Sequence, residues 1–325
     1  MKAVVRDTYG SPDVIEFRDM PKPEPGDDDV LIRVHTASVN PYDWHYLTGT
    51  PYMLRLMAGV RRPRVPVLGA DVAGVVEAVG SQVGGFAPGD RVFGIARGSF
   101  AEWTLTRPQS IAAIPDGVGF DVAAALPIAG LTALQAVRDH AAVESGQSVL
   151  VIGAGGGVGM YAVQLAVARG AAVTGVCSTR NVEVVKSLGA ERVIDYTGED
   201  FAAVGQKWDV IVDAVGDRSF TDVHRSLTPE GVYVMLSGPK SGKLIGPLRR
   251  TLARRARFLF SSQRFANFIA ATSPDDLAEL GALAESGRVR SVIDTRHPLA
   301  DTASAIRKIG TGHARAKTVV DVIEG

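Results

Sequence analysis

The fold is decided at residues 148–159, which read Ser148-Val149-Leu150-Val151-Ile152-Gly153-Ala154-Gly155-Gly156-Gly157-Val158-Gly159. A short apolar run leads into a glycine-dense turn, and helical periodicity follows from Met160 to Arg169. The pattern predicts a strand, a tight turn and a helix. In such a unit the N–H groups of the turn and the positive end of the helix dipole meet where a pyrophosphate can lie, and side chains would block its approach. The sequence therefore predicts dinucleotide binding.

The glycine pattern matches the G-x-G-x-x-G fingerprint imperfectly. The best alignment puts Ala154, Gly156 and Gly159 at the three key positions, so that an alanine replaces the first glycine. A merely flexible turn between a buried strand and a buried helix is the alternative. The position of the match, directly after an apolar run and before an apolar helical stripe, favours the dinucleotide interpretation.

Further strands and helices alternate downstream of this unit. Strands are expected at 172–177, 192–194, 209–213 and 232–236, with helices at 181–188 and between residues 219 and 227. Alternation of this kind predicts an α/β fold with a doubly wound parallel sheet. Such sheets bind ligands beyond the carboxyl ends of their strands, so we expect residues 213–216 and 237–238 near the cofactor.

The end of the second strand bears on which nicotinamide cofactor is bound. An acidic residue about twenty positions beyond the glycines would favour NAD, because it accepts hydrogen bonds from the ribose hydroxyls. The sequence instead reads Cys177-Ser178-Thr179-Arg180, and its hydroxyls and guanidinium suit a ribose phosphate. We therefore predict NADP(H). The alternative is that Arg180 is simply a solvated residue before a helix.

The composition limits the class of protein. The chain has 325 residues with 46% hydrophobic content, enough for about two domains. Its 35 basic and 35 acidic residues cancel, so no nucleic-acid partner is expected. A single cysteine, Cys177, excludes an intramolecular disulfide and a multi-cysteine zinc site. The start of the chain lacks an apolar core and no apolar run approaches membrane-spanning length, so we expect a cytoplasmic protein.

The region before the nucleotide unit has a different character. Alternating or β-rich segments at 30–34, 73–79 and 91–95 are separated by proline and glycine turns, which predicts a compact β-barrel-like domain. The end of the chain resembles this region in sequence pattern, with an expected helix at 300–309 and a last strand at 317–322. We expect both to return to the first domain. The predicted domains are therefore 1–122, completed by 262–325, and a cofactor domain at 123–261.

Several separated motifs occur in one order along the chain, and they are Ser38-Val39-Asn40-Pro41-Tyr42-Asp43-Trp44, Gly69-Ala70-Asp71-Val72-Ala73-Gly74, Pro88-Gly89-Asp90-Arg91-Val92, Gly98-Ser99-Phe100-Ala101-Glu102, Leu126-Pro127-Ile128-Ala129-Gly130-Leu131-Thr132-Ala133 and Gly312-His313-Ala314-Arg315-Ala316-Lys317. With them the chain resembles the medium-chain dehydrogenase/reductase superfamily, in its zinc-free quinone-oxidoreductase-like branch. The resemblance spans nearly the whole chain. It implies a GroES-like catalytic domain, a Rossmann cofactor domain, a cleft between them and, commonly, a homodimer.

The resemblance also exposes a departure from the zinc alcohol dehydrogenases. Where those enzymes place a ligating cysteine and a Gly-His-Glu motif, this chain has the segment 40–43 and Gly69-Ala70-Asp71. We therefore expect no metal and no zinc-polarised alcoholate. The predicted function is NADPH-dependent hydride transfer to a quinone or an α,β-unsaturated carbonyl, a hydrophobic small molecule. The alternatives are an alcohol or aldehyde dehydrogenase of the same superfamily, and a non-catalytic NADPH-binding or membrane-docking protein.

The same resemblance assigns candidate site residues. The catalytic candidates are Tyr52 first, as proton donor or anion anchor, then Asn40 and Tyr46, with His45 and Asp43 as weaker ones. The tyrosines could instead pack with locally bonded hydroxyls, and Asn40 could brace its turn. The cofactor candidates are Ala154, Gly156, Gly157, Val158 and Gly159 for the pyrophosphate, Ser178, Arg180 and Tyr196 for the adenosine ribose phosphate, Thr132, Val215, Ser237 and Phe260 for the nicotinamide, and Lys317 for a phosphate or ribose.

One segment, 244–260, lies outside the minimal family pattern. Leucines and an alanine recur at four-residue steps, while arginines lie broadly opposite; the apolar set is Leu244, Leu248, Leu252 and Ala256 and the basic set Arg250, Arg254 and Arg257. This predicts an amphipathic helix. It is expected either to make a peripheral contact with an anionic membrane or to cover a lipophilic quinone. The alternative is a helix packed on its own domain or on a dimer partner.

Overall fold

The computed structural model divides the chain into two compact units. Unit 1 comprises residues 1–131, 272–287 and 291–325, and unit 2 comprises residues 132–271 and 288–290. The structure describes residues 1–237, 246–312 and 315–323, with the backbone alone for 246–251. Gly238, which is expected near the cofactor, residues 313–314 of the last family motif and the start of the predicted amphipathic helix lie outside the described residues.

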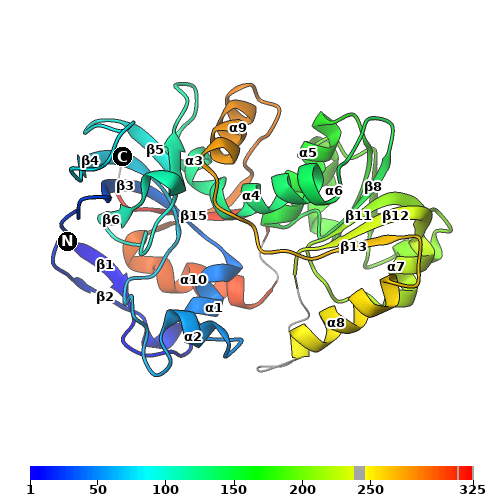
Figure 1. The fold of residues 1–325 in the computed structure, drawn as a ribbon, viewed down its shortest axis with the longest axis horizontal. Coiled ribbons are helices and arrows are strands. Elements are labelled where there is room, and N and C mark those ends of the chain that lie inside the picture. Colours follow the sequence, from blue (N-terminus) through cyan, green and yellow to red (C-terminus); the bar gives the residue numbers. More distant parts are fainter. Residues whose placement is uncertain (238–245, 313–314, 324–325) are drawn as a thin grey trace. The chain divides into compact units, whose positions relative to one another are not determined.

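Unit 1 is built on a seven-stranded sheet and a separate two-stranded pair (Figure 1). The sheet has the order β14-β15-β3-β4-β5-β7, with β6 paired to β3. The strands are β1 (Lys2–Val5), β2 (Glu16–Asp19), β3 (Val30–Val39), β4 (Asp71–Val79), β5 (Arg91–Ile95), β6 (Trp103–Thr106), β7 (Ile111–Ala113), β14 (Ile293–Pro298) and β15 (Lys317–Asp321). The helices are η1 (Pro12–Val14), α1 (Pro41–Thr48), α2 (Leu54–Ala58), η2 (Pro108–Ser110), α3 (Phe120–Ala125), α9 (Pro274–Glu285), η6 (Leu299–Asp301) and α10 (Thr302–Gly310).

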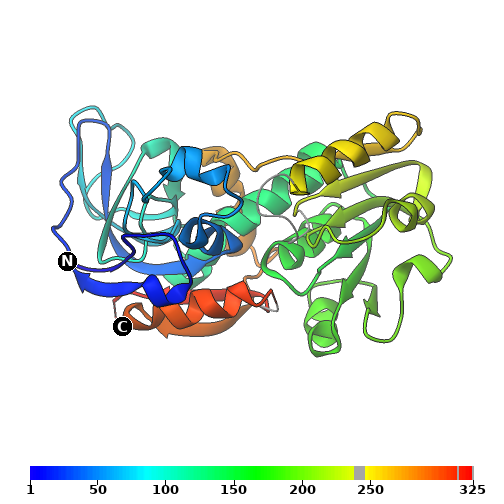
Figure 2. The same ribbon diagram turned by 90° about the horizontal axis from the view of Figure 1, so that it is seen from below.

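The last strand returns to the first unit, as predicted. β15 pairs antiparallel with β3, with Val320 opposite Ala37 and Thr318 opposite Val39. In Figures 1 and 2, α10 lies beside α1, and the two helices contact each other. The end of the chain thus completes the core of unit 1, because Val320 of β15 and Ile306 of α10 pack with Val39 of β3 in one buried cluster.

Unit 2 is the predicted doubly wound sheet. Six parallel strands have the order β10-β9-β8-β11-β12-β13. They are β8 (Ser148–Ile152), β9 (Ala172–Cys177), β10 (Arg192–Asp195), β11 (Trp208–Asp213), β12 (Leu227–Met235) and β13 (Arg264–Ala266). The helices are α4 (Pro127–Gln135), which starts in unit 1, η3 (Ala136–His140), α5 (Gly157–Ala168), η4 (Thr179–Asn181), α6 (Val182–Ser187), η5 (Phe201–Ala203), α7 (Phe220–Ser226) and α8 (Gly246–Phe258). Across the described residues, no helix has both the length and the apolar character needed to cross a membrane.

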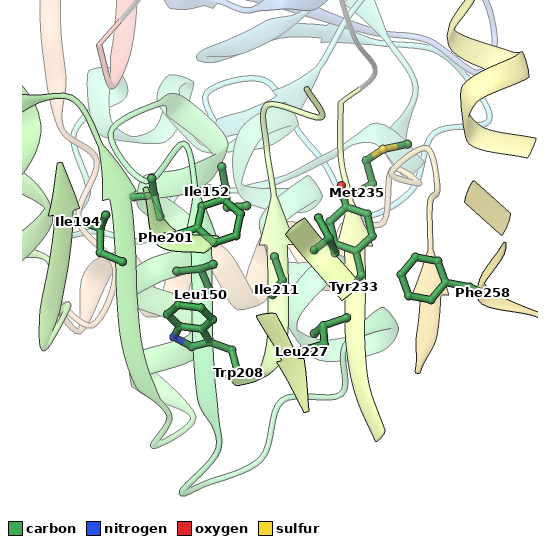
Figure 3. Packing of buried hydrophobic residues seen from close by; sticks show 12 residues of the cluster. Leu150, Ile152, Ile194, Phe201, Trp208, Ile211, Leu227, Tyr233, Met235 and Phe258 are labelled. Carbon is green, nitrogen blue, oxygen red and sulfur yellow. The ribbon is translucent and has the colours of Figure 1, made fainter. Parts of the chain in front are cut away.

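The core of unit 2 fixes where its strands end. Figure 3 shows side chains of neighbouring strands, among them Leu150, Ile211 and Tyr233, packed in one buried cluster with Trp208 and Phe258. Consecutive residues of β8, from Val149 to Ile152, are all buried, so both faces of the sheet are covered and a one-residue shift would exchange side chains that pack against different neighbours. The register therefore fixes which residues follow each strand at the carboxyl edge.

The unit boundaries fall later in the chain than 122/123 and 261/262. Helix α3 contacts β3 and β4, and this keeps residues 120–125 with unit 1. Strand β13 pairs in parallel with β12, with Tyr233 opposite Phe265, so residues 264–266 extend the sheet of unit 2. This short strand carries no clear periodic pattern, and the pairing comes from tertiary structure.

Candidate cofactor and substrate sites

The glycine-dense turn lies between β8 and α5, as predicted. Gly153 has a positive φ of 82°, a conformation that side chains disfavour. Gly156 is the N-cap of α5, no side chain caps this helix end, and its first turn carries no acidic residue. The N–H groups at the start of α5 therefore point their partial positive charge at space that an anion can fill.

Two glycines of this turn serve different purposes. A Cβ at Gly159 would lie 2.1 Å from the carbonyl oxygen of Gly153, so a side chain there cannot coexist with the turn. A Cβ at Gly156 would meet only that oxygen, at an ordinary distance of 3.4 Å. Gly159 thus lets the helix pack on the turn, whereas the missing side chain of Gly156 leaves room for a pyrophosphate, and this fits a dinucleotide.

The other predicted cofactor residues of unit 2 follow the carboxyl ends of neighbouring strands. Ser178 and Arg180 follow β9, Tyr196 follows β10, Val215 follows β11 and Ser237 follows β12. Because all of these strands are parallel, their carboxyl ends share one edge of the sheet. The structure therefore brings these five residues to the same edge as the glycine turn.

Asn181 belongs to this edge and was not among the predicted site residues. Its side chain is 7% exposed, and its Oδ1 accepts no hydrogen bond within the described part of the chain. A Cβ at Gly155 would lie 2.5 Å from Asn181 Nδ2, so the amide packs directly on the glycine turn. A buried carbonyl oxygen without a donor is costly, and a ribose hydroxyl is a donor of the right kind. In the sequence, Asn181 itself carried only the signal of a helix start, at the beginning of the helix expected at 181–188.

Asp213 holds the loop that carries Val215. Its Oδ1 accepts from the N–H groups of Val215 and Gly216 at 2.9 and 2.8 Å, and its Oδ2 accepts from the Tyr233 hydroxyl at 2.8 Å. Burial raises the pKa of the Asp213 carboxyl, and the backbone and tyrosine donors oppose that rise. The Asp213 carboxyl therefore fixes the backbone of the loop at Val215 and Gly216.

Phe260 does not lie at the carboxyl edge. Helix α8 carries the chain from the end of β12 back toward the start of β13, and Phe260 follows its last turn. Two residues later, Ser262 donates to the carbonyl of Pro229, in the first half of β12. Because β12 and β13 are parallel, Phe260 is at the amino edge of the sheet, opposite the glycine turn. Its predicted nicotinamide contact is therefore wrong. Thr132 lies within α4, where unit 2 begins.

Unit 1 contains a buried polar network that joins three strands and a helix start. Lys317 of β15, 2% exposed, donates from Nζ to Asn40 Oδ1 at 2.7 Å and lies 3.4 Å from Asp71 Oδ2. Asn40 Nδ2 donates to Asp71 Oδ2 at 2.7 Å, as does Ser38 Oγ at 2.8 Å. The N–H of Ile128 donates to Asp71 Oδ1 at 3.0 Å. Burial lowers the pKa of Lys317, and the Asp71 carboxylate opposes this effect.

This network shows that two predicted site residues, Asn40 and Lys317, bond to each other inside unit 1. Asn40 and Lys317 are buried and bonded to each other, so their polar groups act inside unit 1. Asp71, quoted in the sequence only as part of a motif, is the centre that both of them contact. The sequence separates the three residues widely, and the β3, β4 and β15 pairing brings them together.

Asp43 closes the start of α1 next to this network. Its Oδ2 accepts from the N–H of Asn40 at 2.7 Å, while its Oδ1 is buried with no hydrogen-bond partner in the described residues. Burial raises the pKa of Asp43 to about 7, and nearby Asp71 adds to this. Arg6 is also buried, and its Nε likewise lacks a partner among the described atoms. The Asp43 carboxyl therefore caps the start of α1.

The tyrosine candidates differ in their surroundings. Tyr46 of α1 stacks on Tyr42 with ring centroids 4.0 Å apart.

Tyr52 follows α1 and is partly exposed, and the Arg55 guanidinium lies 4.8 Å from its ring centroid. Arg55 Nε in turn donates to the carbonyl of Gly49 at 3.0 Å, which ties the loop to the end of α1. The Tyr52 hydroxyl has no hydrogen bond within the described chain, whereas His45 Nδ1 bonds the carbonyl of Thr50. Tyr52 is thus available to a ligand.

Other reactive side chains give no further centre. Among the described residues, no three or more His, Cys, Asp or Glu side chains gather closely enough to hold a metal ion. The thiol of Cys177 is buried, and this burial raises its pKa to about 11. Cys177 therefore packs at the end of β9 as an unreactive thiol.

Comparison with known proteins agrees with this architecture. A family model described as "Alcohol dehydrogenase GroES-like domain" matches residues 26–116, and one described as "Zinc-binding dehydrogenase" matches residues 188–320. The chain is 33% identical over 335 residues to the chloroplast envelope quinone oxidoreductase homolog of Arabidopsis thaliana, with 99% of this chain and 98% of that protein covered. It is also 33% identical over 336 residues to an NADPH-dependent alkenal/one oxidoreductase of that plant, with 98% and 79% covered.

A solved structure shares the whole fold. The quinone oxidoreductase from Coxiella burnetii superimposes with a TM-score of 0.88 at 32% identity, and the match covers 99% of each chain. The similarity extends through both units and agrees with the ordered motifs seen in the sequence. The chain therefore belongs to the medium-chain dehydrogenase/reductase superfamily and is an oxidoreductase of its quinone-oxidoreductase-like branch.

Proposed function

We propose that the protein is an NADPH-dependent, zinc-independent reductase of quinones or α,β-unsaturated carbonyls. The observation that carries the proposal is the uncapped start of α5 behind a turn that leaves space at Gly156, on the same sheet edge as Ser178 and Arg180. Such a constellation suits a dinucleotide with a phosphorylated ribose. Relatives named as quinone and alkenal/one oxidoreductases support the acceptor class.

The residues of unit 2 would hold the cofactor. The N–H groups of Gly157 and Val158 at the start of α5 would bind the pyrophosphate. Arg180 and Ser178 would bind the ribose phosphate, with Tyr196 beside them, while Asn181 Oδ1 would accept from a ribose hydroxyl. Val215 and Ser237 would contact the nicotinamide end, together with Thr132. When bound, the nicotinamide supplies a hydride.

The residues of unit 1 would stabilise the negative charge that hydride addition creates on the acceptor. A quinone or enone that accepts a hydride carries negative charge on an oxygen remote from the attacked atom. A hydroxyl donor can neutralise that charge without a Lewis acid. We assign this donor to Tyr52, because its hydroxyl is unbonded in the described chain and Arg55 holds its ring. Tyr46 would line the acceptor beside it, with Asn40 and Lys317 supporting from within the network.

The chemistry of the donor set around Asp71 supports the proposed zinc independence. Asp71 uses Oδ2 to accept from Asn40 and Ser38 and lies against the Lys317 ammonium, while Oδ1 accepts from a backbone N–H. A lysine ammonium repels a cation, and it occupies the oxygen that would bind one. We further propose a homodimer, the assembly that the family resemblance implies.

The test is NADPH oxidation with a naphthoquinone and with a simple enone, followed by the loss of absorbance. Turnover is expected with at least one of these acceptors and is expected to survive a chelator. Tyr52→Phe should lower kcat by about tenfold or more while the Kd of NADPH stays unchanged.

Tyr9→Phe is the matched control. Its ring contacts the same Arg55 guanidinium, and its hydroxyl donates to the Gly59 carbonyl rather than facing a ligand. Its kcat should stay within about twofold of wild type. Wild-type kcat in Tyr52→Phe would remove Tyr52 from the proton-donor role. A complete lack of turnover with every quinone and enone would overturn the proposed function.

A further inference from the structure

Charge is distributed unevenly along this neutral chain. Residues 231–274 contain no aspartate and no glutamate, but they contain eight basic residues: Lys240, Lys243, Arg249, Arg250, Arg254, Arg255, Arg257 and Arg264. The whole chain has equal numbers of acidic and basic residues. This segment therefore carries a local positive field that the net charge conceals. Helix α8 lies at its centre.

Arg254 anchors the inward face of the described part of α8. Arg254 Nη1 donates to the Tyr233 hydroxyl at 2.7 Å, and Nη2 donates to the carbonyl of Arg218. One turn later, Phe258 is buried against Tyr233 and Phe265. Positions 254 and 258 lie on one face of a helix, so this face is fixed against the sheet of unit 2 (Figure 1).

The outward face consequently carries the apolar residues. Leu252 is 56% exposed and Leu259 is 75% exposed, and seven-residue spacing puts them on one stripe. Exposed Arg255 lies between them, and Phe260, just beyond the helix, is 94% exposed. Among the described residues of the two predicted sets, Leu252 and Ala256 are exposed and Arg254 is the one that packs inward. A soluble surface rarely exposes a clustered set of large apolar side chains without a partner.

The composition of this face discriminates between possible occupants. A second copy on a two-fold axis would place this acid-free segment against itself, so that like charges oppose each other. A nucleic acid would match the arginines and leave the leucines and Phe260 in water. An anionic bilayer surface satisfies both sets, because its headgroups attract arginines and its outer acyl region accepts leucine and phenylalanine.

We propose that the outer face of α8, comprising Leu252, Arg255, Leu259 and Phe260, docks the protein on an anionic lipid surface. The helix would lie in the plane of the interface with these side chains toward the lipid, while Arg254 and Phe258 hold it on unit 2. The proposal does not depend on the acceptor or on turnover. A lipophilic quinone dissolved in the bilayer would, however, be concentrated near a protein held in this way.

The experiment is co-sedimentation of the full chain with vesicles of phosphatidylcholine alone and of phosphatidylcholine mixed with phosphatidylserine. Binding is expected only to the anionic vesicles and should weaken as salt is added. Leu259→Asp and Arg255→Glu should each weaken vesicle binding by about tenfold or more. Both positions are exposed, so thermal unfolding and NADPH binding should remain those of wild type.

Met57→Asp is the matched control, because Met57 is an exposed apolar residue of α2 in unit 1. The Met57→Asp variant introduces the same negative charge at an exposed position outside α8, and it should bind vesicles like wild type. Equal binding to neutral and anionic vesicles, or no binding to either, would overturn the proposal. So would variants that bind anionic vesicles like wild type, or that lose self-association in sedimentation velocity while keeping vesicle binding.

Discussion

At the scale of single residues, two neighbours at the end of β9 have different chemistry and are proposed to bind different groups of the adenosine ribose. Arg180 is exposed and carries a charge, whereas Asn181 is buried and its carbonyl oxygen has no donor among the residues that the structure describes. A guanidinium gains most from a phosphate, because the hydrogen bonds are charge-assisted and can be bidentate. A buried amide oxygen needs a neutral donor. The cofactor preference is therefore expected to depend on Arg180.

Arg180→Ala should weaken NADPH binding by about tenfold or more and leave NADH binding nearly unchanged, since the ribose phosphate is the only difference between the two. Calorimetric Kd values for both nucleotides measure this. Arg192→Ala is the control, because Arg192 is an exposed arginine of β10 paired with Glu199 at 3.1 Å. It should change neither Kd. Equal losses for NADPH and NADH in Arg180→Ala would contradict the assignment of the phosphate site.

Residue roles were predictable only where a local pattern carries them. The hydroxyls and guanidinium after β9 are adjacent in the sequence, so their shared edge could be predicted. Asn40, Asp71 and Lys317 instead meet through the pairing of β3, β4 and β15. No spacing rule indicates that a lysine 246 residues from Asp71 lies 3.4 Å from its carboxylate. The internal role of Lys317 therefore emerged only from the structure.

At the scale of elements, the strand, turn and helix at 148–168 set the geometry of the cofactor edge. The turn from β8 to α5 must bring Gly159 against the carbonyl of Gly153, which leaves no room for a Cβ at position 159, and it must also leave the start of the helix open. These are separate requirements, one for folding and one for binding. Substitutions at the two glycines can therefore separate them.

Gly156→Ala should fold like wild type but bind NADPH about tenfold or more weakly, because its Cβ meets no atom closer than 3.4 Å yet projects where the pyrophosphate would lie. Gly159→Ala should lose stability, by roughly 2 kcal/mol or more, because its Cβ would overlap the Gly153 carbonyl. Urea unfolding and calorimetry on both variants measure the two effects. Wild-type affinity in Gly156→Ala, or wild-type stability in Gly159→Ala, would contradict this division.

Element prediction succeeded where periodicity is strong and failed where packing decides. The strands at 172–177 and 91–95 were predicted with the bounds that the structure has, because apolar runs between turn residues are unambiguous. The orientation of α8 was not predictable, because a helix with one leucine face is expected to bury that face. Here the Tyr233 hydroxyl and the Arg218 carbonyl accept from Arg254 and hold the opposite face inward.

At the scale of the whole molecule, the two units place their buried charges differently. Unit 2 has Asp213 surrounded by donors, whereas one buried cluster of unit 1 contains the carboxyls of Asp43 and Asp71 together with Lys317. Arg6 is buried near Asp43 without a hydrogen-bond partner for its Nε in the described residues. Burial favours the protonated form of Asp43, Asp71 adds to this effect, and Lys317 opposes it. The stability of unit 1 should therefore depend on pH.

The sign of that dependence follows from the raised pKa of Asp43. The folded group has a pKa of about 7, above the unfolded value of about 4, so the folded state binds more protons between these two pH values. The free energy of unfolding contributed by Asp43 must then fall as pH rises from about 4 to about 7. It is fully present below the unfolded pKa and lost above the folded one.

Asp43→Asn should remove this slope, because the amide oxygen still accepts from the N–H of Asn40 while the side chain no longer ionises. Between pH 5 and pH 8, wild type should lose about 2 kcal/mol more of its free energy of unfolding than the variant does. Urea unfolding of the full chain at both pH values measures the difference. Asp116→Asn, in an exposed turn of the same unit, should keep the wild-type slope. Parallel pH profiles for wild type and Asp43→Asn would show that the carboxyl ionises in the folded protein as it does in the unfolded chain, and the buried cluster would then contain two anions with Lys317.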